Sequence, residues 1–223
     1  MSGRSAPATM PLSLRAWFGL TALCAALVVL GLGSVYAGDS EPAAVDTRIG
    51  AAVDEAGPPW RDIALAVDFL GEPLGAATLV GVAVIGCLSL RRPRAAVSVV
   101  AGAGAAVGVA TLLKHLVGRT IHGEANLSYP SGHTAFLTAL ALVVALAATG
   151  RLGLGGAAGL SLVLASALVA GFGMGWAQVV LGAHYPTDAF GGWCTALAVT
   201  PTTTWLVDCV VDRIPESRRP TPR

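Results

Sequence analysis

Six long runs without a charged residue constrain this chain more than any other feature. Each is close to the roughly 17–25 residues that cross the hydrocarbon core of a membrane as a helix. The longest run is expected to begin with a turn, because glycines gather at its start. The runs are Ala16–Gly38, Pro73–Leu90, Ala95–Leu113, Thr134–Gly150, Leu152–Ala183 and Ala189–Val207. They predict an all-α fold, a six-transmembrane-helix bundle that forms one domain.

Only 12% of the 223 residues are charged, whereas a soluble domain has about a quarter. The predicted membrane domain spans residues 16–212, between cytoplasmic tails at 1–15 and 213–223. A net charge of +1 gives no basic surface for nucleic acid. Arginine outnumbers lysine 13 to 1 in an Ala- and Gly-rich chain, which favours a bacterial source.

The positions of the basic residues predict the topology. If the N-terminus is cytoplasmic, ten of the 14 Lys and Arg residues fall inside: Arg4, Arg15, Arg91, Arg92, Arg94, Arg151, Arg213, Arg218, Arg219 and Arg223. The positive-inside rule then puts both termini in the cytoplasm. The first run also resembles a signal peptide with a small-residue cleavage site after Ala37, although its length favours a retained helix.

Segments between and within the runs give weaker signals. Asp62–Leu70 has apolar residues at helical spacing and is expected to lie along the membrane surface. Two pairs of glycines at GxxxG spacing, Gly104 with Gly108 and Gly171 with Gly175, suit close helix packing or arise by chance. Four cysteines without paired spacing predict neither disulfides nor a zinc site: Cys24, Cys87, Cys194 and Cys209.

The predicted topology brings the polar, chemistry-bearing stretches of the chain to one membrane face. The third run ends outside at Lys114 and Arg119, and the fourth starts outside just after His133. The fifth ends near His184, and the sixth begins at Asp188. These stretches contain all four histidines of the chain. We therefore expect a single site at the outer membrane boundary.

The residue types at this face suit a bound phosphate. Lys114 and Arg119 supply positive charge, and Ser131 and Gly132 open a helix whose N–H groups point at an anion. No group of carboxylates that would demand Mg²⁺ is evident, so no metal or cofactor is expected. Two histidines suit phosphoryl transfer, one as nucleophile and one as acid. Taken singly, each stretch also fits a helix cap, a hydrogen-bonded His–Asp pair or cations at a membrane boundary.

Together, Lys114–Arg119, Y-P-S-G-H at 129–133 and G-A-H-Y-P-T-D at 182–188 resemble the type 2 phosphatidic acid phosphatase (PAP2) family. The resemblance implies metal-independent hydrolysis of lipid phosphates. It implies His184 as a nucleophile that forms a phosphohistidine, with Asp188 orienting it and His133 protonating the leaving oxygen. It also implies that Lys114, Ser131 and Gly132 hold the phosphate oxygens.

Two of the three motifs depart from the family pattern. Where the first motif has Arg-Pro, this chain has Ile121 and His122, and Arg119 stands two residues early as a substitute. Where the third motif has Ser-Arg, it has Ala177 and Gln178, so Gln178 is the candidate phosphate ligand there. An amide donates a hydrogen bond but carries no charge, which indicates a different headgroup or a weaker enzyme.

The leading hypothesis is a lipid phosphate phosphatase of the bacterial cytoplasmic membrane, with its site facing the periplasm or exterior. Expected substrates are a polyprenyl pyrophosphate such as undecaprenyl pyrophosphate, phosphatidic acid or phosphatidylglycerol phosphate. Two alternatives stay open. One is a protein that binds or transports lipid phosphates without turnover, and the other is a lipid-dependent phosphotransferase. Partners are the lipid substrate and the membrane, while the oligomeric state is not predicted.

Overall fold

The computed structural model describes residues 8–54 and 57–213, and every regular element in them is helical. A short 3₁₀ turn, Leu12–Leu14, leads into the first helix. The helices are α1 (Arg15–Val35), α2 (Ala44–Asp54), α3 (Pro58–Asp68), α4 (Pro73–Ser89), α5 (Pro93–Val117), α6 (Gly132–Leu152), α7 (Gly156–Val180) and α8 (Pro186–Arg213). Each of the six uncharged runs is therefore a helix, and the all-α prediction is confirmed.

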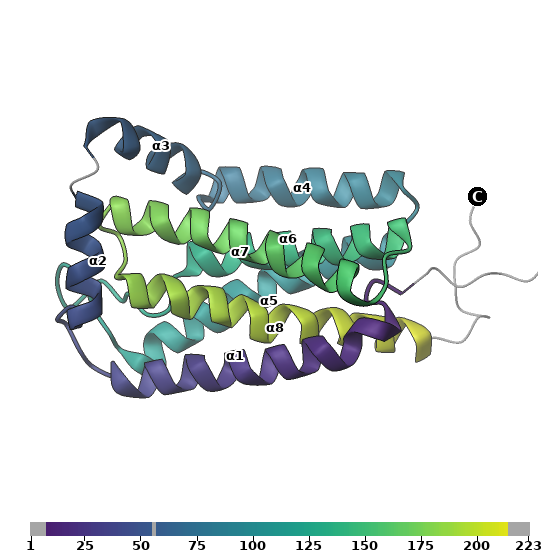
Figure 1. Ribbon diagram of the computed structural model, residues 1–223, viewed down its shortest axis with the longest axis horizontal. Coiled ribbons are helices and arrows are strands. Elements are labelled where there is room, and N and C mark those ends of the chain that lie inside the picture. The colour runs from purple at the N-terminus through teal and green to yellow at the C-terminus, as the bar shows by residue number, and fades with distance from the viewer. Residues whose placement is uncertain (1–7, 55–56, 214–223) are drawn as a thin grey trace, which may run out of the picture.

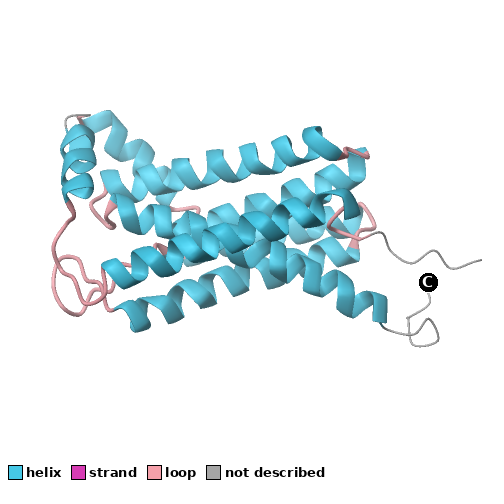
Figure 2. Ribbon diagram, turned by 60° about the horizontal axis from the view of Figure 1, so that its bottom comes forward, coloured by secondary structure: helices cyan, strands magenta, loops and turns pink. Residues whose placement is uncertain are grey.

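The long helices form one bundle, with α6 packed against α5, α7 and α8 (Figure 1). Five of them are long and apolar enough to cross a membrane: Leu12–Val35, α5, α6, α7 and α8. Helix α4 has only 17 residues, and it joins α3 through a break with a 59° bend to make a sixth candidate span. Connecting loops gather at the two ends of the bundle (Figure 2).

Local sequence explains where these helices begin and end. Proline stands in the first turn of α3, α4 and α5, where its missing N–H costs no helical hydrogen bond. Ser131 caps α6 and accepts a hydrogen bond from the Thr134 N–H. Gly118 and Gly153 end α5 and α6 in the left-handed conformation that glycine adopts without strain. The turn predicted at the start of the fifth run lies at 153–155.

The segment before α1 belongs to the bundle, which differs from the predicted tail at 1–15. Thr9, Met10 and Leu14 are buried. The N–H groups of Thr9 and Met10 donate to the carboxylate of buried Asp208 on α8 at 3.0 and 2.9 Å. A carboxylate inside an apolar bundle needs such donors, so α8 fixes this segment. Residues 1–7 and 214–223 of the predicted tails lie outside the described residues.

Only one of the two GxxxG pairs mediates close packing. A Cβ built on Gly171 would lie 2.0 Å from Trp193 Cδ1, and one on Gly175 would lie 3.2 Å from the Ala189 Cβ. Helices α7 and α8 therefore approach closely at this pair. Among the described residues, nothing lies within 4 Å of a Cβ built on Gly104 or Gly108, so no close helix contact is made at this pair on α5. All four cysteines are free.

Helices α2 and α3 cover one end of the bundle, opposite the end where the described chain begins and finishes (Figure 1). Helix α3 includes most of the predicted helical stretch 62–70 and packs against α7. The rings of Trp60 and Trp176 meet edge to face with centroids 6.0 Å apart. Helix α2 was not predicted, and it contacts α7 and α8. These two helices bring acidic side chains to the face where the predicted site residues lie.

Candidate active site

The starts of α6 and α8 are in direct contact. The Ser131 N–H donates to the Asp188 carbonyl oxygen at 2.9 Å. A Cβ on Gly192 would lie 2.3 Å from the Ser131 carbonyl oxygen, so glycine is needed for this approach. The predicted convergence of the P-S-G-H and H-Y-P-T-D stretches is therefore confirmed.

His184 lies in the short connection between α7 and α8, and its side chain is only 8% exposed. Its backbone N–H donates to the Gln178 carbonyl oxygen at 3.4 Å, which ties the residue to the end of α7. The ring nitrogen Nδ1 is 3.8 Å from Asp188 Oδ2 and has no hydrogen-bond partner within the described residues. This distance exceeds that of a hydrogen bond, and catalytic hydrogen bonds often tighten only when substrate binds.

Burial lowers the pKa of His184 below its ordinary value of 6.5. Asp188 opposes this effect, while the charges of Lys114 and His133 add to it. The lowered pKa means that the ring is neutral at pH 7. A neutral imidazole has the free electron pair that a nucleophile needs.

We expect the ring of His184 to titrate with a midpoint below pH 6.5, since the lowered pKa keeps its neutral form populated into mildly acidic solution. The chain has four histidines, so ¹⁵N-histidine NMR in micelles can follow each one. The variant His184→Gln assigns the signal by its loss. A midpoint at or above 6.5 would contradict the statement that burial lowers the pKa of His184.

Arg119 was expected to bind the phosphate, but in the structure it lies in a buried network with two carboxylates. Its side chain is fully buried and donates to Asp188 Oδ1 at 2.7 Å and to Asp46 Oδ2 at 2.9 Å. It also donates to Thr187 Oγ1 at 2.6 Å. Burial disfavours its charge, but the two carboxylates outweigh this effect and raise its pKa. The guanidinium therefore binds Oδ1 of Asp188, while Oδ2 of the same carboxylate faces His184.

Asp46 on α2 completes this buried network and was not found from the sequence. Its Oδ1 accepts from the Thr187 N–H at 2.9 Å, and its Oδ2 accepts from the Thr187 hydroxyl at 3.0 Å. The ring of Tyr185 stacks on Arg119, with the guanidinium carbon 4.5 Å from the ring centroid. Nothing in the sequence distinguishes Asp46 from the other acids of the external segment, because its partners are 73 and 141 residues away.

Three of the other expected phosphate ligands lie at helix ends: Ser131 and Gly132 begin α6, and Lys114 is in the last turn of α5. The Ser131 side chain is buried, and its hydroxyl accepts from the Thr134 hydroxyl at 3.1 Å. A Cβ built on Gly132 would meet nothing within 4 Å in the described part of the chain, so open space adjoins the first turn of α6 there. The Lys114 ammonium donates to the Leu127 carbonyl oxygen at 2.9 Å.

His133 lies against the turn between α3 and α4. Its Nε2 is 3.7 Å from Asp68 Oδ1 and 3.6 Å from Glu72 Oε1. Gln178 Nε2 donates to the same Asp68 oxygen. Two carboxylates therefore lie beside His133, and the sequence did not predict this. Both acids come from the external segment, more than 60 residues before His133. The ligand atoms of Asp68, Glu72 and His133 lie within 4.8 Å of one another, a set that a divalent cation can also bind.

The two remaining histidines lie apart from this cluster. His115 is exposed on α5. His122 is exposed in the loop after Arg119, where its Nε2 is 2.8 Å from the Gly182 carbonyl oxygen. That contact joins the loop to the connection that carries His184.

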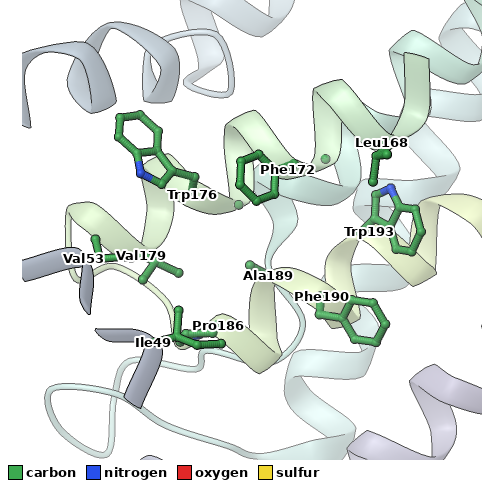
Figure 3. A pocket seen from close by; sticks show the side chains of 12 residues that line it. Ile49, Val53, Leu168, Phe172, Trp176, Val179, Pro186, Ala189, Phe190 and Trp193 are labelled. Carbon is green, nitrogen blue, oxygen red and sulfur yellow. The ribbon is translucent and has the colours of Figure 1, made fainter. Parts of the chain in front are cut away.

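An apolar cavity of 340 Å³ lies beside the start of α8 (Figure 3). Helices α2, α7 and α8 form its wall, with four aromatic side chains among them. Ala189 lines the cavity and follows Asp188 directly in the chain. The lining residues are Ile49, Val53, Leu168, Gly171, Phe172, Gly175, Trp176, Val179, Pro186, Ala189, Phe190 and Trp193. An apolar volume therefore adjoins the polar site.

Fold and site together describe a helical membrane protein with a histidine–aspartate pair at one end of its bundle. The profile of the PAP2 superfamily matches residues 95–210, just over half of the chain. The chain therefore belongs to the PAP2 superfamily, and it is an integral membrane phosphatase of the PAP2 type.

A crystal structure described as the first transmembrane PAP2 type phosphatidylglycerolphosphate phosphatase from Bacillus subtilis has the same fold. The TM-score is 0.67 at 21% sequence identity, and the alignment covers 89% of this chain and 99% of that one. Comparison with curated protein sequences gave no match.

Proposed function

We propose that this protein hydrolyses a phosphomonoester or pyrophosphate of a membrane lipid through a phosphohistidine on His184, without a metal. The pairing of buried His184 with Asp188, itself held by Arg119, which also pairs with Asp46, is the observation that carries the proposal. Because Arg119 binds one oxygen of Asp188, the other oxygen can orient Nδ1 of His184 and leave Nε2 free to react.

In the first step, Nε2 of neutral His184 attacks phosphorus. The bond from phosphorus to the leaving lipid or lipid-phosphate oxygen breaks, and His133 donates a proton to that oxygen. Asp188 accepts a hydrogen bond from Nδ1–H and stabilises the positive charge that forms on the ring. The product is a phosphohistidine and a free lipid alcohol or monophosphate.

In the second step, water attacks phosphorus and the bond from nitrogen to phosphorus breaks. His133, now neutral, takes a proton from the water, which releases inorganic phosphate and restores the starting state. Lys114 and the N–H groups around Gly132 hold the phosphate oxygens throughout. We assign Arg119 to positioning Asp188, since its donors engage buried carboxylates.

The apolar cavity supports a lipid as substrate, because an acyl or prenyl chain in it would leave the headgroup beside α8. Candidate substrates are polyprenyl pyrophosphates, phosphatidic acid and phosphatidylglycerol phosphate, the last acted on by the similar Bacillus subtilis protein. The distribution of arginines supports a site on the outer face of a bacterial cytoplasmic membrane, with both termini inside.

A phosphate-release panel tests this function. Purified protein in detergent with EDTA should release phosphate from at least one of the three lipid classes, and a water-soluble phosphomonoester should be a poorer substrate. Binding of every lipid phosphate without release would instead favour the binding protein. Transfer of phosphate to an added lipid or sugar hydroxyl in place of water would favour the phosphotransferase.

A further inference from the structure

The turn between α3 and α4, residues 69–72, covers the His133 ring. A Cβ built on Gly71 would lie 2.2 Å from His133 Cδ2, so the turn touches the imidazole and only glycine allows it. Helix α3 is held in place by its packing on α7 and by the Trp60–Trp176 contact. The turn is thus seated on the group that we assign as the catalytic acid.

The same turn is flanked by two carboxylates that point to the phosphate-binding groups. Asp68 Oδ1 accepts from Gln178 and lies 3.7 Å from His133 Nε2. Glu72 Oε1 lies 3.6 Å from the same nitrogen. Asp68 is the less exposed of the two, at 21% against 52% for Glu72. Asp68 therefore engages His133, the proposed acid that contacts the leaving oxygen, and Gln178, the phosphate ligand expected from the third motif.

A carboxylate resembles part of a phosphate, because it offers two anionic oxygens to neighbouring donors. An ionised Asp68 and an incoming phosphate cannot share the donors of His133 and Gln178 without like-charge repulsion. The neutral amide of Gln178, in place of the family's arginine, adds no charge to offset this repulsion.

On the basis of the function proposed above, we propose that Asp68 is a specificity-determining residue that acts as an internal anion. In the free enzyme the Asp68 carboxylate binds His133 and Gln178, which contact the substrate phosphate once it has bound. The α3–α4 turn moves aside when a phosphate takes over those donors. A ligand must therefore outcompete Asp68, which selects for groups with several anionic oxygens and against weak single anions.

The variant Asp68→Asn tests this inference, since it removes the charge and keeps the shape. We expect its KM for the lipid phosphate to fall about tenfold with kcat within about twofold of wild type. The dissociation constant for inorganic phosphate, measured by thermal shift in detergent, should fall by a similar factor. All measurements use EDTA, so that no divalent cation occupies Asp68, Glu72 and His133.

The matched control is Asp62→Asn, which removes one negative charge from an exposed position on the same helix. Its KM and phosphate affinity should stay at wild-type values. If Asp68→Asn does not fold, Asp68→Ser serves in its place.

Unchanged KM and phosphate affinity in the Asp68 variant would overturn the inference. So would a loss of kcat at constant KM, because it would show that Asp68 instead maintains the acid His133. The phosphate measurement needs no turnover, so it distinguishes failure of this inference from failure of the proposed phosphatase activity.

Discussion

His184→Ala should lower phosphate release from the preferred lipid phosphate by at least about 10³-fold, because the variant lacks the atom that bonds to phosphorus. The loss should appear in kcat and leave lipid binding largely intact, since Lys114 and the start of α6 are unaltered. Release of phosphate by the purified variant in detergent with EDTA measures the effect.

The control for this variant is His115→Ala, which removes an exposed imidazole from α5. It should keep wild-type activity. Equal phosphate release by His184→Ala and wild type would refute the role of His184. Wild-type protein that binds lipid phosphates but never releases phosphate would refute the proposed hydrolysis of lipid phosphates.

Arg119→Met should cause the second large effect, a loss of about 3–5 kcal/mol of stability together with most of the activity. The substitution leaves Asp46 and Asp188 buried side by side without their cation. The two carboxylates then repel each other, and Asp188 loses the partner that holds it behind His184. A lower midpoint of thermal unfolding in detergent and a lower kcat would report both consequences.

The matched control is Arg48→Met, which removes an exposed arginine from α2 and should change stability by less than about 0.5 kcal/mol. In the double variant Arg119→Met with Asp46→Asn, part of the lost stability should return, because one unpaired charge is removed. Arg119→Met protein with normal stability and kcat but a raised KM would contradict this account. It would return Arg119 to the role expected from the sequence, a direct ligand of the phosphate.

The fold was predictable because membrane spans follow from a one-dimensional property, the length of uncharged runs. The number and order of the runs also predicted which helix ends lie at the same membrane face. This prediction placed His133, His184 and Asp188 at one face. Between two helices with the same glycine spacing, however, the sequence did not distinguish the close contact at Gly171 on α7 from the open surface at Gly104 on α5. That difference depends on whether a neighbour such as Trp193 lies opposite.

The carboxylates of the site could not be predicted in the same way. Asp46 and Asp68 belong to an external segment with many acids, and no periodicity marks the two that are directed inward. Their partners are Gln178, where the chain departs from the third motif, and Arg119, which stands two residues before the departure in the first motif. An altered motif indicated a changed site, but only the folded chain shows which acids accompany the change.

Capture of the phosphorylated enzyme tests the central claim most directly. Protein mixed with a ³²P-labelled lipid phosphate in EDTA and quenched within milliseconds should carry label that is stable to base and labile to acid, as expected for phosphohistidine. Peptide mapping should place this label on His184, and His184→Ala should carry none. Label on another residue, or turnover that stops in EDTA and returns with a divalent metal, would contradict the account.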